Sequence, residues 1–195
     1  MSGAAAGRGG GPVIPGRSRL GLVGVVVLLV AALPVLVHAQ VTIQSKEPTD
    51  PQARQIKAGL ERRGMKVYDV VIRRAQGRDP AIWGAVTAAL YGAPTTADVM
   101  NQAANTWDVM HSVLTQEPAA TVLIAAQVWT RYILNFAVTK QEWADFLQAW
   151  NAARSDDQKK AAAERLIKAM SFSVWDVENR RWADRKDFVN KHFAD

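Results

Sequence analysis

The most regular pattern of apolar and polar residues in this sequence covers Thr121 to Val138. From Tyr132 to Val138 apolar residues occupy every second position, the period of a β-strand with one buried face. Val122 to Trp129 is apolar on both faces, as in a strand covered on both sides. Only Thr130 and Arg131 separate the two stretches, so the pattern predicts an antiparallel hairpin, although neither residue is favoured in a two-residue turn. A hairpin this apolar is stable only when helices or further strands cover it.

Two helices with capping residues are predicted before this hairpin. Asp50 followed by Pro51 is typical of a helix start, and Gly64 suits the left-handed cap at its end. Thr95 and Asp98 have the spacing of a capping box. Apolar stripes at helical spacing follow both starts, with Ala53, Ile56 and Leu60 in the first helix and Val99, Ala103, Trp107, Met110 and Leu114 in the second.

Weaker alternation between these helices predicts two strands. In Lys66 to Arg74, we expect Tyr68, Val70 and Ile72 on one face and Val67, Asp69 and Val71 on the other. Ala81 to Tyr91 predicts a second strand, and its Gly, Ala and Thr content is also compatible with a helix. The order helix, strand, strand thus occurs twice, which we interpret as two tandem units of one supersecondary pattern.

After the hairpin, helical spacing returns. An amphipathic helix with an aromatic face, expected to cover the remaining sheet surface, is predicted from Trp143, Phe146, Leu147 and Trp150. Ala161 to Met170 predicts a further helix, with Ser155 and Asp156 as candidate caps. Residues 171–195 are expected to form a C-terminal arm, with a short hairpin or extended stretch and then a helix that carries Phe188 and His192 on one side.

These elements predict an α+β fold. We expect an antiparallel sheet of about four strands from the two helix–strand–strand units, helices mainly on one face, and a helical C-terminal region. Residues 40–195 have the length of one ordinary domain.

The first 39 residues differ in composition from the rest. Arg8, Arg17 and Arg19 precede an apolar run from Leu20 to Val37, and Val37 and Ala39 place small residues at the cleavage positions, which is the order of a secretory signal peptide. We expect cleavage after Ala39 and a secreted or extracytoplasmic product. The alternative is a membrane anchor retained through residues 20–39, because about 18 apolar residues is the lower limit for a membrane span.

The absence of cysteine and the net charge exclude some classes of protein. The chain has no cysteine, which excludes disulfides and lipid attachment to a cysteine at the cleavage site. It has 24 Lys and Arg against 18 Asp and Glu, and three of the arginines lie in the first 39 residues, so the net charge of +6 falls to +3 for residues 40–195. Half of the net positive charge of the chain therefore comes from the leader.

Few residues suggest catalysis. His111 and His192 are the only histidines after the leader, and no spacing is typical of a metal site, so we predict neither metal nor cofactor. A cysteine nucleophile and a Gly-x-Ser-x-Gly elbow are both missing from the sequence. Asp69 lacks an explanation as a cap or turn residue. The weak catalytic candidates are thus Asp69 and His111, which would make the protein an extracytoplasmic hydrolase.

Binding is the preferred hypothesis. The partner would be an anionic lipid, a wall polymer or a protein. Four arginines in a basic stretch are candidate contacts: Arg62, Arg63, Arg73 and Arg74. Two tryptophans in the charged segment near the C-terminus, Trp175 and Trp182, are the others. We expect Trp107, Trp129, Trp143 and Trp150 in the core or at a subunit interface, and no nucleic acid as a partner. The leading hypothesis is an exported, non-catalytic binding domain of the cell envelope; a structural subunit of a homo-oligomer is the further alternative.

Overall fold

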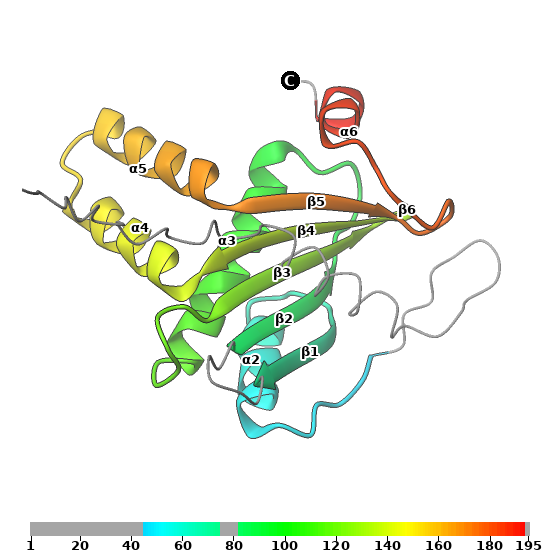
Figure 1. The fold of residues 1–195 in the computed structure, drawn as a ribbon, viewed down its shortest axis with the longest axis horizontal. Coiled ribbons are helices and arrows are strands. Elements are labelled where there is room, and N and C mark those ends of the chain that lie inside the picture. The colour runs from blue at the N-terminus through cyan, green and yellow to red at the C-terminus, as the bar shows by residue number, and fades with distance from the viewer. Residues whose placement is uncertain (1–44, 75–81, 194–195) are drawn as a thin grey trace, which may run out of the picture. The chain divides into compact units, whose positions relative to one another are not determined.

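The computed structural model describes residues 45–74 and 82–193, so the predicted leader lies outside the described residues. The described residues form five helices and one six-stranded sheet (Figure 1). In chain order the elements are α2 (Pro51–Arg62), β1 (Val67–Arg74), β2 (Ile82–Ala89), α3 (Thr96–Val113), β3 (Val122–Trp129), β4 (Tyr132–Thr139), α4 (Lys140–Ala152), α5 (Asp156–Ala169), β5 (Ser171–Asp176), β6 (Arg181–Trp182) and α6 (Arg185–His192).

The six strands follow one another across the sheet in chain order. Four of the neighbouring pairs are antiparallel, and β2 pairs with β3 in parallel. The α+β class is therefore confirmed, whereas the expected antiparallel sheet of about four strands is wrong in strand number and in this central pairing. The parallel pair arises because α3 carries the chain back along the sheet, as a crossover between parallel strands must. The two additional strands, β5 and β6, come from the C-terminal segment.

The central hairpin has the predicted position and connection. Trp129 pairs with Tyr132, so Thr130 and Arg131 alone form the turn. Thr130 has a φ of +50°, the left-handed conformation that a β-branched residue rarely adopts. Contacts of Arg131 secure this turn, because its carbonyl accepts from the Val177 amide at 3.0 Å and its guanidinium lies 3.4 Å from an Asp176 carboxylate oxygen.

The predicted caps start the predicted helices. The Asp50 carboxylate accepts from the amides of Gln52 and Ala53 at 2.8 and 3.1 Å, and Thr95 with Asp98 forms the capping box of α3. Gly64 has the left-handed φ of +80° expected after α2. A further capping box at Thr139, the last residue of β4, starts α4 without an intervening loop.

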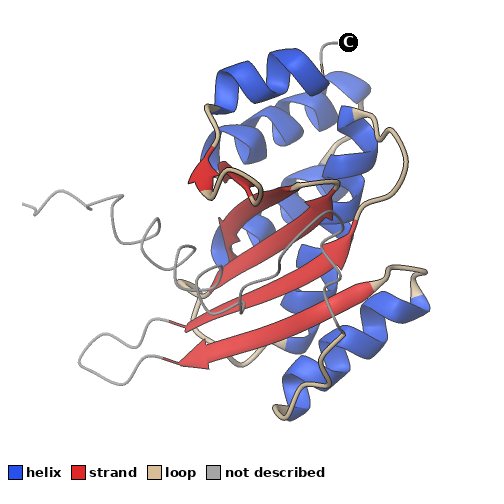
Figure 2. Cartoon of the chain, turned by 90° about the vertical axis from the view of Figure 1, so that its right-hand side faces the viewer, coloured by secondary structure: helices blue, strands red, loops and turns tan. Residues whose placement is uncertain are grey.

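All five described helices contribute to one main core on one face of the sheet, which we call the helix face (Figure 2). The largest fully buried side chain is that of Trp107 on α3. Gly84 of β2 provides the space that this helix needs: a Cβ added there would lie 2.6 Å from Met110 Cε. Each helix buries at least one residue in this core, among them Ile56 (α2), Trp107 (α3), Trp143 (α4), Leu166 (α5) and Phe188 (α6).

The C-terminal segment is built into the sheet and the core. Its β5 strand pairs with β4 from Ala137↔Ser171 to Tyr132↔Asp176. On α6, the Phe188 ring lies 4.8 Å from that of Tyr132, and His192 lies 5.4 Å from the Trp129 ring, centroid to centroid. Phe188 and His192 therefore share one side of a terminal helix, as predicted.

The two helix–strand–strand units share an element order but differ in hand. β1 and β3 run in opposite directions, because β1 is antiparallel to β2 and β2 is parallel to β3. Across the sheet, β2 follows β1 and β4 follows β3 in the same direction. When β1 is placed on β3 with the same strand direction and the helices on the same face, β2 and β4 therefore lie on opposite sides of that strand. No rotation superposes the units, so they are not copies in space.

The aromatic helix α4 does not cover the sheet as expected. Trp143 is buried against Trp107 with ring centroids 5.4 Å apart, but Trp150 is 39% exposed and does not belong to the core. In Figure 1, α4 and α5 extend together beyond the ends of the strands. Because α4 starts directly at the end of β4, the helix leads away from the sheet and packs on α3 and α5.

Candidate functional site

The strand side chains that point away from the helices form the back face of the sheet. The strand register aligns them in four rows. The central row is Val71, Ala85, Ile124, Ala137 and Ser171. The row on one side of it is Arg73, Trp83, Val122 and Thr139. The row on the other side is Asp69, Thr87, Ala126, Asn135 and Ser173, and beyond it lies the row Ala89, Val128, Ile133, Trp175 and Trp182.

A bulge in β1 assigns Tyr68 to this face. Val67 pairs with Ala88 and Asp69 with Thr87, so Tyr68 is an extra residue in the strand. The predicted faces of β1 were therefore partly wrong: Val67 joins the helix face, and Tyr68 lies on the same face as Asp69. One extra residue changes which side chains share a face, because side chains alternate strictly along a regular strand.

Apolar residues on the back face form a second cluster, separate from the main core. Ala126, Val128 and Ile133 are buried, and Tyr68, Trp175 and Val177 pack against them. None of the described helices contributes a residue to this cluster. The back face thus has the side chains of an interior layer.

Charge is almost absent from the back face. Of the described strand residues that form its rows, only Asp69 and Arg73 are charged, and both are in β1. They are four positions apart, which is about 13 Å along a strand. The Arg73 guanidinium lies 5.4 Å from the centre of the Trp83 ring, a cation–π distance. The charges on this face are therefore balanced and confined to one edge.

Trp175 and Trp182 come together at the opposite edge of the back face. Their ring centroids are 5.1 Å apart and the rings meet edge to face. Both side chains are half-buried, and they occupy neighbouring strands at the end of one row. The two predicted binding tryptophans therefore form one aromatic corner, next to the second apolar cluster.

The four predicted binding arginines do not form one patch. Arg62 is the last residue of α2 and Arg63 is its C-cap, whereas Arg73 and Arg74 end β1, whose eight residues span about 25 Å. Arg63 pairs with Asp108 at 2.7 Å, and Arg74 pairs with Asp50 and Glu117 at 3.1 and 2.8 Å.

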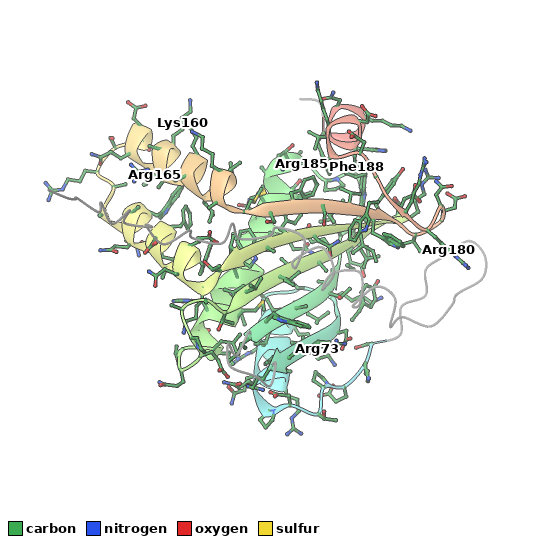
Figure 3. All side chains as sticks on the ribbon, viewed as in Figure 1. Arg73, Lys160, Arg165, Arg180, Arg185 and Phe188 are labelled. Carbon is green, nitrogen blue, oxygen red and sulfur yellow. The ribbon has the colours of Figure 1, made fainter. Side chains whose placement is uncertain are left out.

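Arg62 Nε donates to the carbonyl of Ala58 on its own helix at 3.2 Å. Arg73 alone of the four points to the back face, and Figure 3 shows it far from Arg180 and Arg185 at the other edge of the sheet. The charge expected to be concentrated in one basic region is therefore divided, and half of it is paired with acids.

The two catalytic candidates lie on opposite sides of the sheet. Asp69 belongs to the back face, whereas His111 is in α3 on the helix face. Burial and the nearby Lys140 ammonium lower the pKa of His111, while Asp108 opposes the shift. His111 Nδ1 is buried and makes no hydrogen bond to the protein. The structure does not bring Asp69 and His111 together.

No group of three or more His, Asp or Glu among the described residues is arranged to hold a metal ion. None of the described helices has the length and hydropathy of a membrane span.

Sequence reasoning missed the back face as a surface. Its rows combine single residues from four or five strands, and their alignment depends on the register and on the parallel β2–β3 pair. The one signal that could have indicated it is the apolar character of β3 on both of its faces. The chain matches no known protein family, no curated protein and no solved structure in the comparisons made with each.

Proposed function

We propose that this chain is an exported, non-catalytic domain that binds a protein partner through the back face of its sheet. The observation that carries this proposal is the second apolar cluster, to which none of the described helices contributes. An extended apolar face with aromatic residues at its borders and little charge is typical of a protein-binding surface. Trp83 at one end and the Trp175–Trp182 pair at the other are residue types enriched at such surfaces.

A protein partner fits this surface better than an anionic lipid or a wall polymer does. A polyanion is bound by several unpaired cations close together. The four candidate arginines are split between two sites, and Arg63 and Arg74 already have acidic partners. The hydrolase alternative has no support from the positions of Asp69 and His111.

Export is tested by expressing the full chain in a secreting bacterial host, fractionating the culture and weighing the product by mass spectrometry. We expect a soluble extracytoplasmic product that begins at Gln40. A product that keeps residues 1–39 and is found in the membrane fraction would contradict cleavage and support the anchored alternative.

Binding is tested by placing a photo-crosslinking amino acid at Thr87 or Val122, both half-buried on the back face. The matched control carries the same amino acid at Asn101, which is exposed on α3. We expect a discrete crosslinked protein product from the two back-face positions and not from the control. Irradiation that yields no product at Thr87 and Val122 would contradict the proposal.

A further inference from the structure

We infer that the partner of the back face is a second copy of this chain, packed face to face to form a two-sheet sandwich. This inference rests on the proposed function, since it names the protein that the back face binds. It is carried by three observations: the length of chain available to cover the face, the shape of the face, and the positions of its two charges.

After the proposed cleavage, the N-terminal segment is too short to cover the face. Cleavage after Ala39 leaves five residues, 40–44, before Ser45. The chain reaches the sheet at its β1 edge, where the Lys46 amide donates to the Tyr68 carbonyl at 2.8 Å. Five extended residues span at most about 18 Å and have the width of a single strand, so they leave most of a five-strand face uncovered.

The size of the face suits a dimer. Four strands of eight residues and one of six occupy an area about 24 Å wide and about 20–26 Å long, or roughly 600 Å² before side-chain relief is included. A standard protein interface takes about 800 Å² from each partner. Two back faces in contact therefore come close to the size of a stable interface.

The middle of the face has no aromatic side chain. Its central row combines the small residues Ala85, Ala137 and Ser171 with the β-branched residues Val71 and Ile124. The large aromatic residues are at the ends of the strands. A face of small and β-branched residues fits another sheet, because packed sheets approach to about 10 Å through interleaved side chains.

The two charges of the face are self-complementary. A two-fold axis along the central row would place each β1 over the β1 of the other copy, in the opposite direction. This rotation exchanges the row that contains Asp69 with the row that contains Arg73. Each Asp69 then faces the partner copy's Arg73, and the interface contains the pair twice, as an isologous contact requires.

The charge pair provides a test that does not depend on disrupting the apolar face. The oligomeric state of the secreted mature protein is measured by sedimentation equilibrium for four proteins: the wild type, Asp69→Arg, Arg73→Asp and the double variant Asp69→Arg/Arg73→Asp. We expect a dimer for the wild type. Each single variant puts like charges together twice, so its dimer Kd should rise at least about tenfold. The double variant restores both pairs and should return to within about threefold of the wild type.

Glu164→Arg is the matched control, because Glu164 is exposed on α5 and distant from the sheet faces. It reverses the same charge and should leave the dimer Kd unchanged. A wild type that is monomeric at every concentration would overturn the inference. Equal weakening by the single and double variants would overturn the paired arrangement.

The crosslinked product separates this inference from the proposed function. A product from Thr87 with twice the mass of the mature chain supports both. A product that contains a different, identified protein overturns the second copy and leaves the proposed function standing. The absence of any product overturns both, and this result does not depend on how the charge variants fold.

Discussion

At the scale of single residues, Gly84 decides how closely α3 approaches the sheet. A Cβ at this position would meet Met110 Cε at 2.6 Å and Leu114 Cδ1 at 3.4 Å, and both side chains are fully buried. We expect Gly84→Ala to lower the free energy of unfolding by about 1–3 kcal/mol, as overpacked cores do. Urea denaturation measures this. The double variant Gly84→Ala/Met110→Ala should lose less than the sum of the single losses, and strict additivity would contradict the contact.

His111 should make stability depend on pH. Its pKa in the folded chain is lowered by burial and by Lys140, so the folded state binds a proton less readily than the unfolded chain does. Its contribution to stability is therefore complete above the ordinary pKa of about 6.5 and is lost as the pH falls below that value towards the folded-state pKa. We expect His111→Gln to reduce the decline in the free energy of unfolding between pH 7 and pH 5. His192, whose pKa is also lowered, mainly by burial, accounts for a remaining slope. An unchanged pH profile in His111→Gln would refute this assignment.

At the scale of elements, Lys140 connects the end of α3 to the start of α4. Its ammonium donates to the carbonyl oxygens of Leu114 and Thr115 at 3.1 and 2.9 Å, and also to that of Glu117. These carbonyls lie at or just after the helix C-terminus, where a cation is favourable. We expect Lys140→Met to reduce the free energy of unfolding by about 2 kcal/mol, measured by urea denaturation. Lys160→Met, which changes an exposed lysine of α5, is the control and should have an effect within about 0.5 kcal/mol.

The elements also show which parts of the structure a single sequence can reveal. The Thr121–Val138 hairpin and the caps at Asp50 and Thr95 were correctly predicted, because local periodicity and capping chemistry act within a few residues. The faces of β1 were not, because one bulge shifts the alternation at Tyr68. The arginine patch also failed to form, since Arg63 and Arg74 find acids more than 20 positions away in the sequence.

At the scale of the whole molecule, the C-terminal segment is part of the folding unit. Without β5, the apolar strand β4 would become an unprotected edge, and the Phe136 ring would lose its stacked neighbour Phe172, 4.7 Å away. We expect a chain that ends at Met170 to be largely insoluble, and a chain that ends at Ala183, which lacks only α6, to retain its sheet. Soluble yield and circular dichroism test this difference. A soluble, folded product ending at Met170 would show that the segment is dispensable.

The parallel pairing of β2 with β3 also has a consequence for how the chain folds. Residue 83 pairs with residue 122 and residue 89 with residue 128, a constant separation of 39 positions, whereas β3 and β4 are joined by a two-residue turn. The β3–β4 hairpin closes a short loop, whereas pairing β2 with β3 closes a long loop that contains α3. Contacts between residues far apart in the sequence form slowly, because closing a long loop costs more entropy. We expect the pairing of β2 with β3 to be the rate-limiting step of folding. Substitutions in the α3 core, such as Ala103→Gly, should then slow refolding, while substitutions on α6 should mainly speed unfolding.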